Sequence, residues 1–519
     1  MIAWSLKNSF VNCEASEEIE TVASYINNPT VHDRKYGGIR PSTAILMDLV
    51  MAHMTVAQVE TATGGILVSG SKSALLSGIS IDSRTLRLSD LFFAIRGTRN
   101  DGHDHVLTAL QKGASGVVVD FRYEIPEGFP ANKILLRVEN THEALKDLAA
   151  CVRRQWRGSL VGITGSMGKT TTKEFMTQVL QTEFSVYRSP GNYNNLFGLP
   201  LAIFGLSPED HIGIFEMGMS APGEIAEMCR IALPDVGVIT NVAPVHLEFF
   251  DSVEAIARVK SELAEGLAAG GTLIYNADDP LVSGIAGRFS GDKISFGLSA
   301  SADIRAEEIE ITGLMETRFR LVCEGAGRRA VIHLGGAHYV MNALPAVALA
   351  RRYTIGIEQI TESLRHLRQA HMRGQILNFQ EGFTVIDDSY NSSPCALTQM
   401  IETLTRIPHH RRRILVAGEM LELGKESESL HRRCGTRAAE GGVDIVVGVQ
   451  GAAREIVRGA VAAGMPDTQV HFFTEANPAS DFICRNVKPG DLVLIKGSRG
   501  VHLEKMVQAL RAAYTEMVG

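Results

Sequence analysis

The stretch from Gly162 to Thr172, Gly-Ile-Thr-Gly-Ser-Met-Gly-Lys-Thr-Thr-Thr, constrains the fold of this chain more than any other. The apolar run Ser159–Val161 before it predicts a buried strand, and Lys173–Leu180 after it predicts a helix. A glycine-rich turn between a strand and a helix lets backbone N–H groups approach phosphates, and the helix N-terminus adds positive partial charge. The strict phosphate-loop pattern G-x-x-x-x-G-K-[ST] fails at its first position, where Ile163 stands.

The side chains of this loop indicate which groups would hold a nucleotide. Lys169 would reach the β- and γ-phosphates of ATP, and the Thr170 hydroxyl would lie on Mg²⁺. An accidental glycine turn is the alternative, and the position of Gly-Lys-Thr between strand and helix argues against it. The loop residues predicted to bind ATP are Gly165, Ser166, Met167, Gly168, Lys169, Thr170 and Thr171.

Composition and charge exclude several classes of protein. The chain has 519 residues, which suggests three or four domains, and 45% of them are hydrophobic. A net charge of -7 offers no basic surface for nucleic acid. The seven cysteines include no C-x-x-C pair, which suits a reducing cytoplasm and argues against a zinc or disulfide framework. No apolar run reaches the length of a membrane span and no signal peptide is recognisable, so we expect a cytoplasmic protein.

Strands alternate with helices along most of the chain, which predicts the α/β class with parallel sheets. The residues before about Met51 are polar and lack clear periodicity, so we expect residues 1–53 to form a weakly ordered N-terminal extension. Three segments, 54–155, 156–372 and 373–519, are expected to form separate domains, with the phosphate loop in the second. A hinge is expected at His371–Gly374, between the second and third domains.

Polar residues follow two buried strands of the predicted central domain. Glu216 comes directly after Gly213–Phe215, and His246 follows Val236–Ile239 at a short distance. The carboxyl ends of parallel strands line the ligand site of such a sheet, so both side chains are expected beside the phosphates. A carboxylate, the Thr170 hydroxyl and water suit Mg²⁺, which takes few protein ligands. On these grounds alone, a solvated strand end for Glu216 and a structural role for His246 stay open.

A polar loop of the first domain follows the predicted buried strand Asp90–Ile95. Its side chains Arg96, Arg99 and His103 are suited to a diphosphate, and an ordinary solvated loop is equally compatible with them. The residues themselves do not decide between these two interpretations.

Several ordered motifs resemble those of the Mur ligases, which build the peptide of peptidoglycan precursors. The central motifs are Gly162–Glu174, Asn194-Asn195 with Gly198 and Pro200, Glu216–Gly218, Asn241-Val242 with His246–Glu248, and Lys260 with Glu262. The later motifs are Asp387–Asn391 with Pro394, Gly418–Gly424 with His431, and Lys496–Arg499. The resemblance covers nearly everything after residue 54. It implies a three-domain architecture with a central P-loop domain on a parallel sheet and a Rossmann-like C-terminal domain.

The later motifs resemble the branch of the family that joins D-Ala-D-Ala to UDP-N-acetylmuramoyl-tripeptide. This resemblance implies a reaction that uses ATP and two Mg²⁺ sites and passes through an acyl phosphate. It further implies that 54–155 binds the UDP-sugar, 156–372 binds ATP and 373–519 binds the dipeptide, in a monomer. The third residue of the tripeptide, diaminopimelate or lysine, stays open.

The resemblance also assigns individual residues. The catalytic residues it implies are Lys169, Glu216, His246 and Lys260. The metal ligands it implies are Thr170, Glu216, His246 and a carbamoylated Lys260. The further ATP-binding residues it implies are Asn342, Arg373 and Asp388. The substrate-binding residues it implies are Ser83, Arg84, Asp101, Gly102, His103, Asn194, Asn195, Tyr390, Asn391 and Pro394.

Lys260 is the residue on which spacing and resemblance disagree. Spacing alone favours a lysine on the surface of the helix Val253–Leu267, paired with Glu262, whereas the family match favours a modified metal ligand. A bare ammonium cannot bind a cation, so the second role requires the carbamate. The chain departs from the family pattern at Tyr339 in place of asparagine, Ser392-Ser393 in place of Ala-Asn, and Glu419 in place of aspartate.

Four other functions fit the sequence less well than this one. The Mur ligases that add the third amino acid carry an Asp/Asn-Pro-Arg tripeptide, which does not occur here. Folylpolyglutamate synthetase would leave Asp82–Arg84 and Asp101–His103 of the first domain unexplained. A non-catalytic nucleotide-binding module would not need the whole catalytic set. A P-loop kinase or motor-type ATPase offers no use for the first and third domains.

Overall fold

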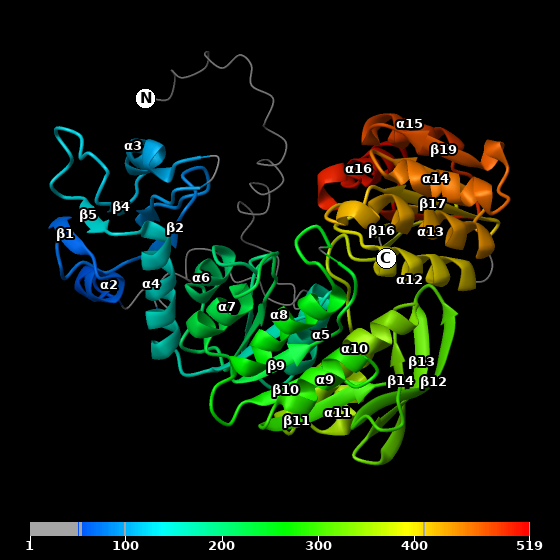
Figure 1. Cartoon of the computed structure of the whole chain (residues 1–519), viewed down its shortest axis with the longest axis horizontal. Helices are drawn as coiled ribbons and strands as arrows, with labels where there is room; N and C mark the ends of the chain where they lie inside the picture. The colour runs from blue at the N-terminus through cyan, green and yellow to red at the C-terminus, as the bar shows by residue number, and fades with distance from the viewer. Residues whose placement is uncertain (1–49, 51–53, 98–99, 246, 408–409, 518–519) are drawn as a thin grey trace, which may run out of the picture. The chain divides into compact units, whose positions relative to one another are not determined.

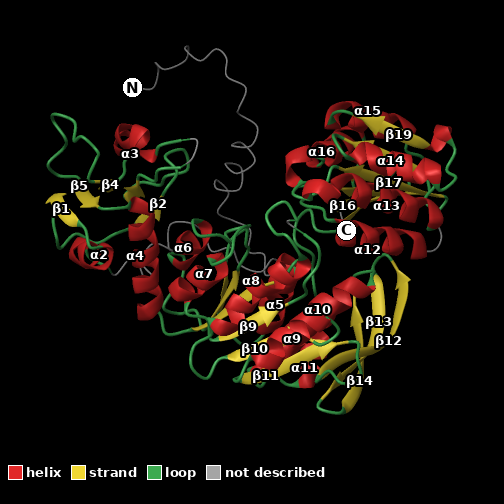
Figure 2. Cartoon of the chain, in the orientation of Figure 1, coloured by secondary structure: helices red, strands yellow, loops and turns green. Residues whose placement is uncertain are grey.

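The computed structural model describes residue 50 and residues 54–97, 100–245, 247–407 and 410–517. These residues form three β-sheets accompanied by α-helices, which confirms the α/β class (Figures 1 and 2). Arg99 of the candidate diphosphate loop lies outside the described residues, and so do two other predictions. These are the weakly ordered extension, of which only Val50 is described, and the metal ligand His246.

The first sheet has five strands in the order β1-β5-β4-β3-β2. Only β1 is antiparallel to its neighbour, and the other strands run parallel. The strands are β1 (Ile66–Ser69), β2 (Gly78–Ser80), β3 (Asp90–Phe93), β4 (Gly116–Asp120) and β5 (Ile134–Val138). The helices are α2 (Val56–Thr63), the 3-10 turn η3 (Gly102–His105), α3 (Val106–Gln111) and α4 (Thr141–Gln155).

The second sheet has nine strands in the order β14-β13-β12-β11-β10-β9-β6-β8-β7. The strands are β6 (Ser159–Thr164), β7 (Val186–Arg188), β8 (Ile212–Glu216), β9 (Val236–Ile239), β10 (Thr272–Asn276), β11 (Asp292–Gly297), β12 (Ile304–Gly313), β13 (Glu316–Cys323) and β14 (Ala326–Ile332). The helices are α5 (Lys169–Leu180), α6 (Gly198–Ile203), α7 (Glu224–Ala232), α8 (Val253–Glu265), α9 (Pro280–Arg288), α10 (Ala337–Arg352) and α11 (Ile357–Arg365).

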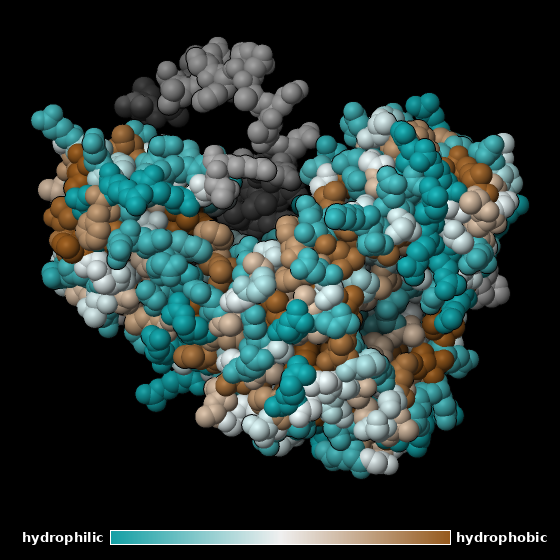
Figure 3. Space-filling model, viewed as in Figure 1, coloured by the Kyte–Doolittle hydropathy of each residue, from teal (hydrophilic) through white to brown (hydrophobic). Residues whose placement is uncertain are grey.

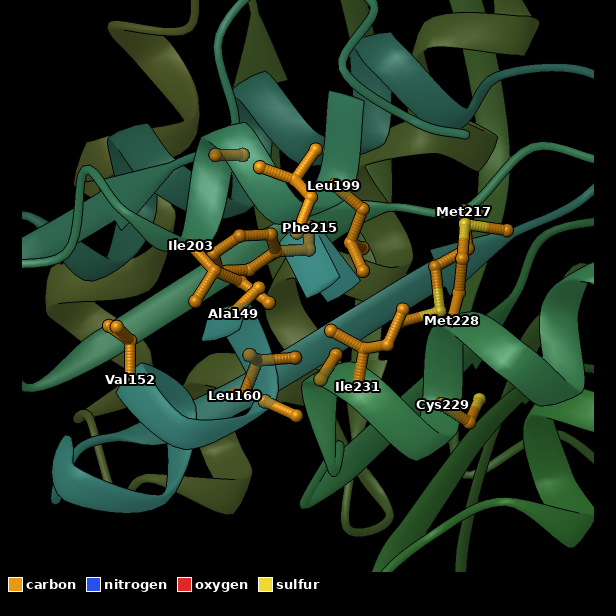
Figure 4. Close-up of a cluster of buried hydrophobic side chains, with 14 of the residues drawn as sticks. Ala149, Val152, Leu160, Leu199, Ile203, Phe215, Met217, Met228, Cys229 and Ile231 are labelled. Carbon is orange, nitrogen blue, oxygen red and sulfur yellow. The ribbon is translucent and has the colours of Figure 1, made fainter. Parts of the chain in front are cut away.

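Helices cover both faces of the parallel part of this sheet, so its strands are apolar on both sides. Ile163 of β6 packs into a core with α5, α10 and α11, whereas Leu160 packs into a second core with α6, α7 and α8. Figure 4 shows Ala149 and Val152 of α4 in the second core, near Ile203 and Leu160. Helix α4 therefore joins the first sheet to the second through one continuous core.

The third sheet has six strands in the order β15-β16-β20-β17-β18-β19, and only β15 is antiparallel. The strands are β15 (Gln375–Asn378), β16 (Thr384–Asp388), β17 (Arg412–Gly418), β18 (Ile445–Val449), β19 (Val470–Phe473) and β20 (Asp491–Lys496). The helices are α12 (Pro394–Arg406), α13 (Ser427–Glu440), α14 (Ala453–Ala462), α15 (Ala476–Asn486) and α16 (Glu504–Ala513), with 3-10 turns at Gly424–Glu426, Asp467–Gln469 and Arg499–Val501. Helices α12–α14 pack on one face and α15 and α16 on the other, which confirms a Rossmann-like layering.

The antiparallel extension of the second sheet, β12–β14, differs from the parallel alternation that the sequence predicts. Strand β12 pairs with β13, and β13 with β14, in antiparallel register. Accessibility alternates along β12, where half-buried residues such as Ile309 lie between exposed ones such as Glu308 and Glu310, because much of that strand has one face turned to solvent. Three consecutive strands without a helix between them require hairpins, which explains the local change of direction.

The surface mixes polar and apolar side chains in the view of Figure 3. The edge strand β1 exposes Ile66 and Val68, with 57% and 50% of their surface accessible. No helix within the described residues is both long enough and apolar enough to cross a membrane.

Candidate active site

A glycine-rich turn connects β6 to α5, as the sequence predicts. Gly165 and Gly168 have φ angles of 151° and 79°, in the region that favours glycine. A Cβ atom on Gly165 would lie 1.8 Å from Thr240 Oγ1, so a larger residue would displace its surroundings. Gly168 caps α5, which begins at Lys169 rather than at the predicted Lys173. The first N–H groups of the helix therefore belong to the loop and are oriented to bind an anion.

Residues after β9 fix the shape of the loop. The Asn241 carbonyl accepts a hydrogen bond from Ser166 N–H at 3.0 Å, and its Oδ1 accepts one from Met167 N–H at 2.9 Å. The Ser166 hydroxyl accepts a bond from Ala243 N–H at 2.8 Å, and Thr240 Oγ1 donates to the Met167 carbonyl at 2.7 Å. The cradle is thus held in shape by the protein itself, which lowers the cost of ordering it around a ligand.

The Lys169 side chain lies within the phosphate loop. Its Nζ donates to the Gly165 carbonyl at 2.7 Å. Burial lowers the pKa of Lys169, while the nearby Glu216 carboxylate acts in the opposite direction. Among the described residues the hydrogen-bond partner of this ammonium is a neutral carbonyl, which a phosphate oxygen can replace.

Glu216 ends β8 next to the phosphate loop, because Glu216 pairs with Ile163 of the neighbouring strand β6. Its carboxylate accepts hydrogen bonds from Thr170 Oγ1 at 2.9 Å and from Asn194 Nδ2 at 3.0 Å. Burial alone would raise the pKa of Glu216, but the charges of Lys169 and Lys173 and these two hydrogen bonds lower it. The site thus contains an ionised, buried carboxylate beside a hydroxyl, and a solvated strand end is excluded.

Lys260 is buried, with 2% of its surface accessible, on the inner face of α8. The contact of its Nζ that the structure resolves is with Met219 Sδ, at 3.9 Å. Burial, and then the charge of Lys169, lowers the pKa of Lys260 well below its ordinary value. Glu262 instead accepts backbone N–H groups of Gly223 and Ala226. The surface lysine paired with Glu262 that spacing favours is therefore wrong.

A cavity of about 300 Å³ opens beside the loop, between the second and third sheets. Its walls include Met167, Gly168 and Thr171 of the loop, together with the predicted nucleotide residues Asn342, Arg373 and Asp388. Asn342 Oδ1 lies against Gly168, where a Cβ atom would approach it to 2.3 Å. Lys496 Nζ donates to Asp388 Oδ2 at 2.6 Å. The structure thus brings the predicted ATP-binding residues of both domains to one cavity.

Two arginines flank the ring of Tyr390, which follows β16. The guanidinium carbon of Arg373 lies 4.1 Å from the ring centroid, and that of Arg499 lies 5.6 Å from it. Arg373 also donates to Thr170 Oγ1 at 3.4 Å, across the predicted hinge. The neighbouring Asn391 contributes its carbonyl to Lys496 Nζ at 2.9 Å. The predicted dipeptide residues Tyr390 and Asn391 therefore lie beside the nucleotide residues.

Comparisons with known proteins show the family to which the chain belongs. Three Mur ligase models match: the Mur ligase family catalytic domain at 75–153, the middle domain at 163–350, and the glutamate ligase domain at 372–499. A Bacillus subtilis protein named UDP-N-acetylmuramoyl-tripeptide--D-alanyl-D-alanine ligase is 32% identical, over 89% of this chain and 99% of its own length. The chain belongs to the Mur ligase family.

Two solved Mur ligases share its fold. A crystal structure of MurF from Acinetobacter baumannii matches with a TM-score of 0.78 and 28% identity, covering 88% of this chain and 98% of that one. The MurF ligase of Thermotoga maritima, solved in complex with ADP, matches with a TM-score of 0.74 and 28% identity, covering 84% and 97%. The three-sheet architecture is thus that of a Mur ligase, as the sequence implies.

The candidate residues of the first sheet interact mainly with one another. The His103 ring is buried, with Nδ1 2.7 Å from Asp101 Oδ1, and its Nε2 accepts Asp120 N–H at 3.0 Å. Arg96 bridges Asp101 and Asp120. His103 is therefore neither solvated nor free to offer a ring nitrogen to a ligand, and it shapes the loop instead. Gly102 lets that loop turn against β3, because a Cβ atom would lie 2.6 Å from Ile95 N.

Other predicted substrate-binding residues form contacts within the protein that stabilise turns and helix ends. Arg84 pairs with Asp82, and the Ser83 carbonyl accepts the Lys112 ammonium at 2.9 Å. Asn195 Oδ1 accepts the N–H of Gly198 at the start of α6. Pro394 is the first residue of α12, in the position where a helix tolerates proline. No hydrogen bond between described residues connects Ser83 or Arg84 to the phosphate loop.

Of the three family departures, Tyr339 has the clearest structural role. Its buried hydroxyl accepts Gln369 Nε2 at 2.7 Å and donates to the Arg373 carbonyl at 3.4 Å. It thereby ties α10 to the hinge. Ser393 caps α12, and Glu419 accepts the N–H of Ala452 at 2.9 Å.

Sequence reasoning missed His338, which lines the cavity. Burial, and then the charge of Lys496, lowers the pKa of His338 to about 4, so the ring is neutral at neutral pH. Its Nε2 is buried and has no hydrogen-bond partner among the residues that the structure describes, which suits a polar group of a bound ligand. His338 directly precedes Tyr339, where the chain departs from the family pattern, but this position in the sequence does not show that the ring faces the cavity.

Gly168→Ala is expected to weaken nucleotide binding by at least about tenfold, because the new methyl adds a clash with Asn342 to the strain of a positive φ. Gly223→Ala is the matched control, since Gly223 also caps a helix, has a φ of 88°, and faces open space. Isothermal titration with ADP measures the effect. Equal binding by the two variants would contradict a role for the Gly168–Asn342 contact.

Proposed function

We propose that this chain joins D-Ala-D-Ala to UDP-N-acetylmuramoyl-tripeptide with ATP, in peptidoglycan precursor synthesis. The observation that carries the proposal is the Thr170–Glu216 pair beside a phosphate loop, in a chain that spans almost the whole length of relatives with that activity. The Mur ligases that add a single amino acid are disfavoured, because the curated relatives of 30–32% identity bear the D-alanyl-D-alanine name.

ATP would bind in the cavity between the second and third sheets. The loop Gly165–Thr171 would hold the phosphates, with Asn342, Arg373 and Asp388 around the rest of the nucleotide. The ADP complex of the Thermotoga relative supports a nucleotide in this fold. His338, with its unpartnered Nε2, would contact the nucleotide from the cavity wall.

Mg²⁺ fits the oxygen donors beside the loop. Thr170 Oγ1 and the Glu216 carboxylate supply the hard ligands that Mg²⁺ prefers, with water completing the shell. Among the described residues no group of three or more His, Cys, Asp or Glu side chains forms a metal site, which agrees with a water-rich ion. A second Mg²⁺ would be held by His246 and by a carbamate on Lys260.

Lys260 fits a carbamate because its amine is buried and its pKa is lowered. The neutral amine nitrogen would attack CO₂, an N–C bond would form as one C=O π bond opens, and the nitrogen would release one proton, so that a neutral amine would become an anionic ligand. The anionic carbamate would attract the Lys169 ammonium, whose charge disfavours a cationic Lys260.

The chain would act mainly by positioning and charge neutralisation. A carboxylate oxygen of the tripeptide attacks the γ-phosphorus, the β–γ bridging P–O bond breaks, and ADP leaves from an acyl phosphate. The amine of D-Ala-D-Ala then attacks the acyl carbon, loses a proton, and phosphate departs as the amide forms. Lys169 and Arg373 would stabilise the negative charge of the transferred phosphoryl group.

The domains would divide the ligands between them. Residues 54–155 would bind the UDP-sugar through Ser83, Arg84 and the Asp101–His103 loop, and 156–372 would bind ATP. Residues 373–519 would bind the dipeptide near Tyr390, Asn391 and Pro394, and Asn194 and Asn195 would approach the tripeptide. The enzyme would act as a cytoplasmic monomer.

ADP release with UDP-N-acetylmuramoyl-tripeptide and D-Ala-D-Ala tests the proposal. We expect release with the dipeptide and at least about hundredfold less with D-alanine or L-alanine, because a shorter acceptor loses binding energy used in the transition state. Mass spectrometry of the product checks that an amide has formed. Release with a single amino acid on the UDP-dipeptide, and none with D-Ala-D-Ala, would overturn the proposal.

A further inference from the structure

Lys173 is a buried lysine that the proposed reaction does not use. It lies in α5, one turn after the phosphate loop, and 1% of its surface is accessible. Burial lowers its pKa, and Glu216 and Glu174 act in the opposite direction. Burying an ammonium is costly unless hydrogen bonds compensate for the lost water, so its contacts indicate what it does.

The Lys173 ammonium holds the backbone of the segment Ser189–Asn195. Its Nζ donates to the Ser189 carbonyl at 2.8 Å and to the Gly191 carbonyl at 3.2 Å. Both carbonyls belong to the turn that follows β7, and no ion pair of Lys173 is found among the described residues. The ammonium therefore acts as a clasp between the phosphate-loop helix and this segment.

The Ser189–Asn195 segment contacts Glu216 of the proposed site through residues near both of its ends. Ser189 Oγ accepts the N–H of Glu216 at 3.3 Å, and Asn194 Nδ2 donates to the Glu216 carboxylate at 3.0 Å. Further along, Phe197 stacks on the His142 ring of α4, with 4.0 Å between ring centroids. The segment thus connects α5 to the Glu216 carboxylate, and Phe197, just after the segment, contacts α4.

The middle of the segment is largely exposed, although the Asn194 carbonyl accepts the N–H of Gly218 at 2.7 Å. Gly191, Asn192, Tyr193 and Asn195 are exposed, and Tyr193 has 40% of its surface accessible. An exposed turn of this kind is held mainly by the groups at its base. Lys173 contributes two hydrogen bonds there from a buried position.

We propose that Lys173 is a positioning residue that fixes the Ser189–Asn195 segment, so that Asn194 and Asn195 meet the UDP-peptide substrate while the helix holds ATP. The choice of substrate rests on the function proposed above, whereas the clasp rests on geometry alone. Lys173→Met removes the donors at nearly constant volume, and Lys173→Arg keeps the charge and the donors. Lys146→Met is the matched control, because Lys146 is equally buried but pairs with Glu143 and Glu227 on α4 and α7.

Hydrogen–deuterium exchange of the full chain tests the clasp without any substrate. Peptides covering 187–199 are expected to exchange at least about tenfold faster in Lys173→Met than in the wild type, since their local opening becomes easier. Lys173→Arg should restore slow exchange, and Lys146→Met should leave these peptides unchanged. Unchanged exchange in Lys173→Met, or a uniform increase over the whole chain, would overturn the proposal.

Steady-state kinetics then separates positioning from a general structural effect. For Lys173→Met we expect the KM for the UDP-tripeptide to rise at least about tenfold, with the KM for ATP changed less than about threefold. An equal rise in both would overturn the assignment to the UDP-peptide. If the wild type does not join the two substrates, but Lys173→Met still exchanges faster than the wild type, the proposed function would be refuted and the clasp would stand.

Discussion

Replacing Lys169 by methionine is expected to lower kcat for ligation by about 10²–10³-fold, the range seen when one donor to a developing anion is removed. The Lys169 ammonium rests 2.7 Å from a loop carbonyl, next to the Glu216 carboxylate that would bind Mg²⁺. It is therefore placed to meet the extra charge on the phosphoryl group during transfer. ADP release under saturating tripeptide and dipeptide measures the loss.

The control for this substitution is Lys293→Met on β11. Lys293 Nζ also donates to backbone carbonyls, those of Ala286 and Phe289, but it does so at the end of α9. Removing it should leave kcat within about twofold, as expected for a surface substitution away from the site. A Lys169→Met enzyme that keeps more than a tenth of wild-type activity would contradict the role given to this ammonium.

The phosphate loop and its carboxylate were predictable because their signals are local. Glycines at a strand-to-helix junction specify a backbone shape, and a carboxylate at the end of a parallel strand must lie at the same edge of the sheet. The register confirms this, since Glu216 of β8 pairs with Ile163 of β6, two residues before Gly165. Neighbouring strands are therefore enough to bring Thr170 and Glu216 together.

The buried lysines were harder to predict, although the sequence held a signal. Lys260 lies between Ile256 and Leu263 at helical spacing, on the apolar face of α8. The prediction of a surface lysine relied on the charge of Lys260 and neglected its position on the apolar face of the helix. Lys173 likewise precedes Met176 by three residues on the buried face of α5.

The cavity beside the loop could not be derived from local patterns. His338 on α10 and Lys496 at the end of β20 reach it from segments far apart in the chain. Their meeting depends on how the second and third sheets pack, which no periodicity encodes. The hairpin strands β12–β14 were missed for a different reason, because alternating burial there was not separated from the continuous apolar runs of parallel strands.

Lys260→Met is expected to abolish ligation, with a loss of at least about 10²-fold, while preserving or raising stability. The activity should fall because methionine cannot form the carbamate that would hold the second Mg²⁺. Stability should not fall, because replacing a buried polar group by an apolar one of similar shape is nearly neutral or favourable. ADP release in bicarbonate-containing buffer measures the loss of activity, and thermal melting in CO₂-free buffer measures stability.

The pH dependence of stability gives this prediction a sign. Burial lowers the pKa of Lys260 in the folded state below the ordinary lysine value of about 10.4, so the unfolded chain binds one more proton between those two pKa values. In CO₂-free buffer, wild-type stability should therefore rise with pH across that window. Lys260→Met removes the group and should flatten that rise.

Lys146→Met is expected to behave in the opposite way. Burial acts to lower the pKa of Lys146, but Glu143 and Glu227 outweigh it, so its folded-state pKa is raised and its charge stabilises the fold. Removing Lys146 should lower the free energy of unfolding at pH values below the ordinary pKa of lysine. The wild type should lose this stabilisation as the pH rises through the raised pKa of Lys146. A Lys260→Met enzyme that melts earlier than the wild type, as Lys146→Met should, would contradict a neutral buried amine.

The carbamate itself is tested by carbon dioxide. Stripping CO₂ from the wild type should lower its activity, and ¹³C-bicarbonate should restore it together with a ¹³C resonance that Lys260→Met lacks. Lys260→Arg keeps a cation at the same place and should show neither the activity nor the signal, because guanidinium stays charged and does not form the carbamate. Full activity of Lys260→Arg would show that a cation at this position is sufficient, and the carbamate would then have no role in metal binding.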